Sequence, residues 1–152
     1  MSQRLIDLFN ALIEINNDRI EGYQTAAAEA KDVELKLLLS KFSQTSEKCK
    51  SELANQVNLL GGTVIEGTRI TGKFFRAWME VKTALTGNDR KEILDSCEYG
   101  DDVALDTYAK ALKNGADDLN SEQHTFIQAQ YSLIKADHDK VKVLRDALVA
   151  QN

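Results

Sequence analysis

The stretch FNALIEINNDRIEGY, residues 9–23, carries apolar side chains at helical spacing and breaks their row with an asparagine. Residues three and four positions apart lie on one face of an α-helix. The apolar residues that share this face are Phe9, Leu12, Ile20 and Tyr23. Asn16 stands on the same face, where the apolar row should continue. The pattern predicts an amphipathic helix over about residues 4–31 with a polar residue in its buried face.

The same periodicity recurs in three later segments of the chain. It predicts helices over about residues 33–60, 89–113 and 121–150. The first of these should end at Gly61-Gly62, and the last should begin after a cap at Asn120 or Ser121. The chain contains no proline, as expected for long uninterrupted helices. Four amphipathic helices of similar length predict an all-α, antiparallel four-helix bundle that forms a single domain over residues 1–152.

The lengths of the connections predict the topology. Short links around Lys31-Asp32 and around residues 114–120 make the first two and the last two helices antiparallel hairpins. The middle link is much longer, and it contains the loose stretch GGTVIEGTRITG and a short helix predicted over about residues 72–86. A link of this length reaches from one end of the bundle to the other. The two hairpins are therefore predicted to be joined by one long crossover.

The crossover itself has an apolar face. Phe74, Phe75 and Trp78 are its largest members. The sequence favours a role in capping one side of the core, and it leaves open a subunit interface built on Trp78.

Each predicted helix carries a polar or small residue in a core position near its middle. These residues form a predicted polar layer: Asn16, Ser46, Cys49, Asp101, Lys135 and His138. Buried polar groups without partners cost about 1–3 kcal/mol each, so they usually satisfy one another. We hypothesise that Lys135 reaches Asp101 as an ion pair and that the other members supply hydrogen bonds.

The two hairpins resemble each other in sequence. Asn16 precedes Tyr23 by seven residues. Asp101 precedes Tyr108 by the same interval, at an offset of 85 (101 − 16). An offset of 89 (135 − 46) relates the second helices and pairs Ser46 with Lys135, Cys49 with His138 and Phe42 with Tyr131. The chain is thus predicted to be two related helical hairpins.

Several segments resemble an uncharacterised bacterial four-helix-bundle family of the ferritin-like superfamily. These segments are LIEINNDRIEGY, AWMEVKTALTGND, EILDSCEYGDD and QYSLIKADHDKVKVLRD, and the resemblance covers nearly the whole chain. It implies a ferritin-like bundle, and it suggests self-association and a setting in a stress response. In that superfamily, the first and third helices each give a glutamate seven residues before a tyrosine. The second and fourth each give Glu-x-x-His, and together these residues hold two iron or manganese ions.

The residues that match this motif are poor ligands for such a pair of ions. The two glutamate positions hold Asn16 and Asp101, and the Glu-x-x-His positions hold Ser46-x-x-Cys49 and Lys135-x-x-His138. Only Asp101 and His138 keep groups that readily bind iron, and Cys49 suits softer metals. A displaced site that uses Glu98, Asp101 and His138 stays open as an alternative. The sequence favours a bundle without cofactor or catalysis, and places iron or manganese second.

Composition narrows the function classes further. A formal net charge of −5 and a pI near 5.1 argue against nucleic acid and anionic membranes as partners. Two cysteines, no apolar run of membrane-spanning length and no leader-like N-terminus predict a reduced, cytoplasmic protein. Three classes remain: a self-associating or partner-binding bundle with a homodimer as the favoured assembly, a metal-binding protein, and a small-ligand-binding bundle.

Overall fold

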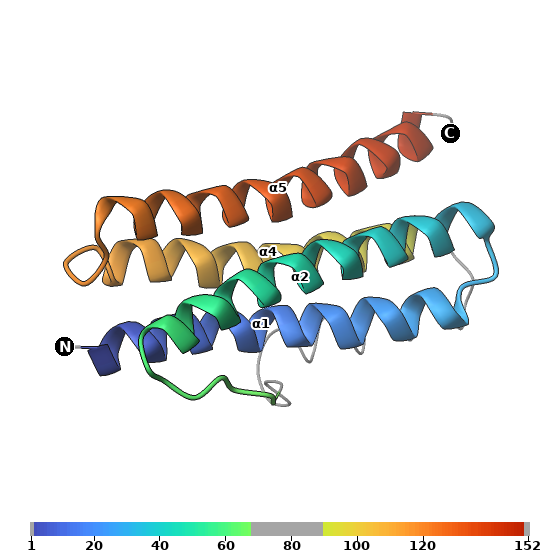
Figure 1. Cartoon of the computed structure of the whole chain (residues 1–152). Coiled ribbons are helices and arrows are strands. Elements are labelled where there is room, and N and C mark those ends of the chain that lie inside the picture. The colour runs from blue at the N-terminus through green and yellow to red at the C-terminus, as the bar shows by residue number, and fades with distance from the viewer. Residues whose placement is uncertain (1, 68–89, 151–152) are drawn as a thin grey trace.

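A computed structural model describes residues 2–67 and 90–150, and these residues form helices and no strand (Figure 1). The four described helices are α1 (Ser2–Glu29), α2 (Val33–Leu59), α4 (Arg90–Asn114) and α5 (Ser121–Ala150). Their bounds agree with the predicted ones to within two residues. The fold is therefore the predicted all-α four-helix bundle. The predicted short helix over residues 72–86, with Phe74, Phe75 and Trp78, lies outside the described residues.

The four helices are arranged as two antiparallel hairpins, α1 with α2 and α4 with α5 (Figure 1). Arg90, the first residue of α4, shows how the hairpins are oriented. Its guanidinium donates to Asp32 at 2.7 Å and to Glu34 at 2.8 Å, both at the start of α2. Because the two helices begin at the same end of the bundle, α2 and α4 run parallel. The end of α2 and the start of α4 therefore lie at opposite ends of the bundle.

The ends of α2 and α5 follow from local capping. Asp32 accepts hydrogen bonds from the backbone N–H groups of Glu34 and Leu35 and so caps α2. At the other end of α2, Gly61 adopts a φ of 77°, a backbone conformation that residues other than glycine rarely adopt. Asn120 caps α5, because its side chain accepts from the N–H of Gln123 and the Gln123 side chain accepts in return.

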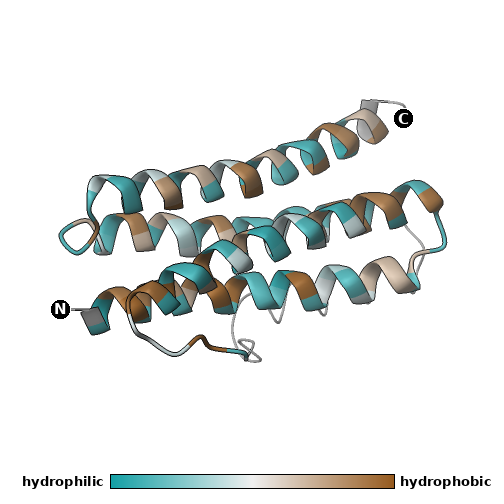
Figure 2. Ribbon diagram, viewed as in Figure 1, coloured by the Kyte–Doolittle hydropathy of each residue, from teal (hydrophilic) through white to brown (hydrophobic). Residues whose placement is uncertain are grey.

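The apolar core is divided into two clusters along the bundle. One cluster includes Phe9 and Leu53, and the other includes Leu39 and Phe42. Figure 2 shows hydrophobic and hydrophilic residues alternating along each helix, as amphipathic helices require. Between the clusters lie the buried polar residues of the candidate site. Among the described helices, none is both long and apolar enough to cross a membrane.

The residues that follow α2 lie along α1. The Asn10 side chain bonds to the backbone of Thr63 and Ile65, and Asn17 donates to the carbonyl of Gly67 at 2.9 Å. Asn17 is only 6% exposed although it lies on the side of α1 away from the core stripe. The middle of α1 is thus enclosed on more than the single face that the apolar pattern predicted.

Candidate functional site

Arg19 of α1 occupies the centre of the bundle, and its side chain is fully buried. Its Nε lies 3.2 Å from Asp101 Oδ1 of α4, and its Nη2 lies 3.3 Å from Asp137 Oδ2 of α5. Nη1 donates to Ser46 Oγ of α2 at 2.5 Å. One guanidinium therefore joins all four helices. Its planar, five-donor geometry suits several acceptors at once.

Tyr23 supports the same group from within α1. Its hydroxyl donates to Asp101 Oδ1 at 2.6 Å, and the Arg19 guanidinium lies 5.2 Å from the centre of its ring. Burial raises the pKa of Asp101 above its ordinary value of 3.8, and Arg19 and Tyr23 offset that effect only in part. Among the described residues, Asp101 Oδ2 has no hydrogen-bond partner. The carboxylate is paired through one of its oxygens.

A second group of buried hydrogen bonds is centred on Tyr108. Asn16 donates to the hydroxyl of Tyr108 at 2.8 Å, and that hydroxyl donates to Gln130 Oε1 at 2.7 Å. Gln130 Nε2 in turn donates to the carbonyl of Cys49 at 3.1 Å and to Glu52 at 3.2 Å. We call the buried members of these two hydrogen-bonded groups together the Arg19 network: Asn16, Arg19, Tyr23, Ser46, Asp101, Tyr108, Gln130 and Asp137.

The network has an internal symmetry that follows the repeat in the sequence. Tyr23 of the first hairpin bonds to Asp101 of the second, and Asn16 of the first bonds to Tyr108 of the second. Each tyrosine is thus satisfied by the residue seven positions before the other tyrosine. The offset of 85 between α1 and α4 places equivalent residues at equivalent buried positions.

Four members of the predicted polar layer are buried: Asn16, Ser46, Cys49 and Asp101. The other two are not, and the predicted pair of Lys135 with Asp101 is wrong. The Lys135 side chain is 51% exposed and pairs with Asp139 on its own helix. His138 lies at the bundle surface and contacts Asp102. Arg19 takes the place that the sequence assigned to Lys135.

The error arises from a one-residue shift in the alignment of α2 with α5. The inward positions of α5 include Gln130, Ile134 and Asp137, which match Phe42, Ser46 and Cys49 at an offset of 88 (130 − 42). An α-helix turns by about 100° per residue, so an offset of 89 selects neighbours that point elsewhere. Asp137 could have been found from its spacing, three residues after Ile134 and four before Val141. Arg19 shows the same spacing, three residues after Asn16 and four before Tyr23.

The centre of the bundle does not fit the two iron or manganese ions that the resemblance implies. Arg19 brings a fixed positive charge, and a guanidinium has no lone pair to give a metal. Asp101 already accepts from Arg19 and Tyr23 through one oxygen, and Asp137 is paired with Arg19. The charge of such ions calls for several carboxylates, which this set does not supply. These side chains suit a structural network of hydrogen bonds and ion pairs around the Arg19 guanidinium.

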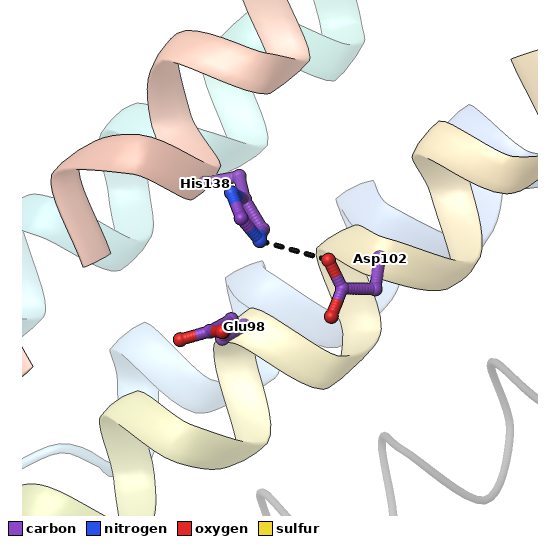
Figure 3. A group of neighbouring side chains, drawn as sticks. All are labelled: Glu98, Asp102 and His138. Atoms are coloured by element: carbon purple, nitrogen blue, oxygen red, sulfur yellow. Dashed lines mark ion pairs between the residues drawn. The ribbon is translucent and has the colours of Figure 1, made fainter. Parts of the chain in front are cut away.

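A second polar group lies at the surface between α4 and α5 (Figure 3). We call it the α4–α5 triad, and it consists of Glu98, Asp102 and His138. One potential ligand atom from each residue lies within 4.8 Å of the others, and His138 Nε2 is 2.8 Å from Asp102 Oδ1. The displaced site predicted from the sequence named Asp101 in place of Asp102. Asp101 instead points inward to the Arg19 network, because neighbouring residues of a helix face different directions.

Both cysteines are buried and are expected to be unreactive in the folded protein. Burial raises the pKa of Cys49 to about 11 and raises that of Cys97 as well. The thiolate is the reactive form, so almost none is present at neutral pH. A colorimetric disulfide reagent should label neither thiol in buffer and both in denaturant. Rapid labelling of the native protein would contradict this assignment of Cys49.

Comparison with known proteins identifies one family. The family model described as a domain of unknown function (DUF2383) matches residues 4–114, which include α1, α2 and α4. No curated protein matches the chain.

Proposed function

We propose that this chain, which belongs to the family described as a domain of unknown function (DUF2383), is a non-catalytic, ferritin-like helical bundle that associates with itself or with a protein partner. The full burial of Arg19 at the bundle centre carries the proposal. The Arg19 guanidinium puts a permanent positive charge at the bundle centre, where a metal-binding ferritin-like protein would need carboxylates. The Arg19 network then fixes the register of the helices, and the outer surface is left for recognition.

Exposed apolar side chains on α2 support the association. Val33 and Leu37, one helical turn apart, are 70% and 67% exposed. Leu59, at the opposite end of the same helix, is 74% exposed. A pair of neighbouring apolar residues gives a better contact surface than a single one. We place the self-association surface at the pair and use Leu59 as its matched control.

The metal part of the proposal is tested by elemental analysis of protein purified without a histidine tag. After aerobic loading with ferrous iron or manganese, we expect less than one tightly held ion per chain at the bundle centre. Asp101→Asn should not change the amount of bound iron or manganese. Two ions per chain that are lost in this variant would overturn the proposal and restore oxygen or peroxide chemistry as a candidate.

The association is tested by size-exclusion chromatography with light scattering over a range of concentrations. We expect a particle of twice the 17.0 kDa chain mass. Leu37→Glu should shift it toward the monomer, whereas Leu59→Glu should not. Both positions are exposed in the single chain, so neither substitution should change the stability of the monomer by more than about 0.5 kcal/mol. A chain that stays monomeric at every concentration contradicts self-association and leaves only a different protein as partner.

A further inference from the structure

We propose that the α4–α5 triad is a binding site for one divalent transition-metal ion, separate from the bundle centre. Glu98 and Asp102 are four residues apart and therefore lie on one face of α4. His138 approaches them from α5, as Figure 3 shows. The Arg19 network uses none of these three side chains. Two carboxylates and one imidazole form the kind of three-ligand set that leaves a fourth position for water.

The geometry needs little change to accept an ion. Zn²⁺ bonds to nitrogen and oxygen are about 2.0–2.2 Å long, so two ligand atoms of a tetrahedral ion lie roughly 3.4 Å apart. The ligand atoms of the triad are already within 4.8 Å of one another. Asp102 is 57% exposed, so its side chain can rotate toward the other two without disturbing the core. Binding of an ion would draw together three side chains that are already close to one another.

The surroundings orient two of the three ligands. His138 Nδ1 lies 3.2 Å from Asp139 Oδ1, and Lys135 holds that carboxylate in turn. Nε2 lies 2.8 Å from Asp102 Oδ1. When a metal ion displaces the proton on Nε2, Nδ1 can still donate to Asp139 while Nε2 gives its lone pair to the ion. This is the outer carboxylate arrangement that metal-binding histidines commonly show. Arg145 contacts Glu98 through Oε2, which fixes that side chain and leaves Oε1 for the ion.

The ligand types decide the class of metal. One imidazole with two carboxylates suits zinc and the neighbouring first-row ions, and the natural order of affinity places zinc above manganese and ferrous iron. No thiolate is present in the triad to favour a softer ion. Zn²⁺ is therefore the probe that the site should bind well, and Mn²⁺ should bind more weakly.

The proposal is tested by calorimetric titration of the tag-free full chain with Zn²⁺. The binding variants are His138→Ala and Asp102→Asn. Their controls are His124→Ala, which removes the other histidine of the chain, and Asp106→Asn, which removes a carboxylate one turn further along α4. Asp106 is 54% exposed, close to the value for Asp102. Circular dichroism checks that each variant keeps its helices.

We expect one Zn²⁺ per chain, with an affinity at least about tenfold lower in each binding variant, since loss of even an outer-shell partner typically costs that much. The two controls should bind as the unmodified chain does. Saturating Zn²⁺ should also raise the thermal unfolding midpoint of the unmodified chain and not that of Asp102→Asn. No saturable binding, or binding that is equal in the binding variants and controls, overturns the proposal. If His138→Ala does not fold, Asp102→Asn alone decides it.

Discussion

Replacing Arg19 by methionine is expected to lower the free energy of unfolding by about 3–5 kcal/mol. Methionine fills a similar volume but leaves Asp101 and Asp137 buried without their shared cation. Breaking one partner of a buried ion pair costs far more than the pair contributes, because the remaining charges keep their desolvation penalty. A domain of this size has about 5–15 kcal/mol in total, so the variant should be marginal. Urea unfolding followed by circular dichroism measures the loss.

Arg4→Met is the matched control for this variant. Arg4 lies on the same helix and also faces an aspartate, but its side chain is 78% exposed and its ion pair with Asp118 spans 3.6 Å. Exposed pairs of this kind contribute about 0–1 kcal/mol. A loss in Arg19→Met no larger than in Arg4→Met would show that the buried guanidinium does not hold the centre together.

The effect of Arg19→Met should also depend on pH. The folded-state pKa of Asp101 lies above its ordinary value, so the folded protein binds a proton that the unfolded chain releases. Stability from this group is therefore present at low pH and falls as pH rises through that interval. Removing Arg19 raises the folded pKa of Asp101 further. The difference between the variant and the unmodified chain should be larger at neutral pH than at mildly acidic pH.

Replacing Phe42 by alanine should also cost about 3–5 kcal/mol. Phe42 is fully buried in α2, and its ring packs edge-on against Tyr23 with ring centres 5.4 Å apart. The substitution removes apolar contacts, leaves a cavity and loosens the tyrosine that donates to Asp101. Denaturant unfolding should show a lower midpoint with an unchanged slope.

Leu59→Ala provides the comparison for Phe42→Ala on the same helix. Leu59 is 74% exposed and lies outside the proposed self-association surface, so its truncation should change stability by no more than about 0.5 kcal/mol. If the two variants lose similar amounts, then Phe42 does not contribute as a core residue. Phe42→Leu should fall between them, because it keeps most of the buried volume.

The helices and their order could be predicted from the sequence because apolar spacing and capping residues are local signals. Asn120 and Gly61 end or begin helices for reasons that lie within a few residues of chain. The parallel arrangement of α2 and α4 followed from link length alone. The bounds and order of the helices can therefore be predicted without knowing which side chains are in contact.

The composition of the central network could be predicted only in part. A polar centre followed from Asn16 and Asp101, which interrupt apolar rows. The identity of the buried cation could not be predicted in this way. Arginine and lysine side chains are usually solvated, so the ordinary expectation is that Arg19 is exposed. Matching residue types at an offset of 89 favours Lys135, whereas the packing of α5 follows an offset of 88. Shifting the alignment by one residue leaves the apparent sequence similarity intact, but it changes the direction assigned to each side chain by about 100°.

The exchange of tyrosine partners between the hairpins has a consequence for cooperativity. The Tyr23 hydroxyl donates to Asp101 of the second hairpin, and the Tyr108 hydroxyl accepts from Asn16 of the first, in addition to its bond to Gln130 within its own hairpin. Either half alone would expose its apolar stripe and lose the buried hydrogen bonds that join the two hairpins. Neither hairpin is therefore expected to be an autonomous folding unit, and the two halves should unfold in a single transition.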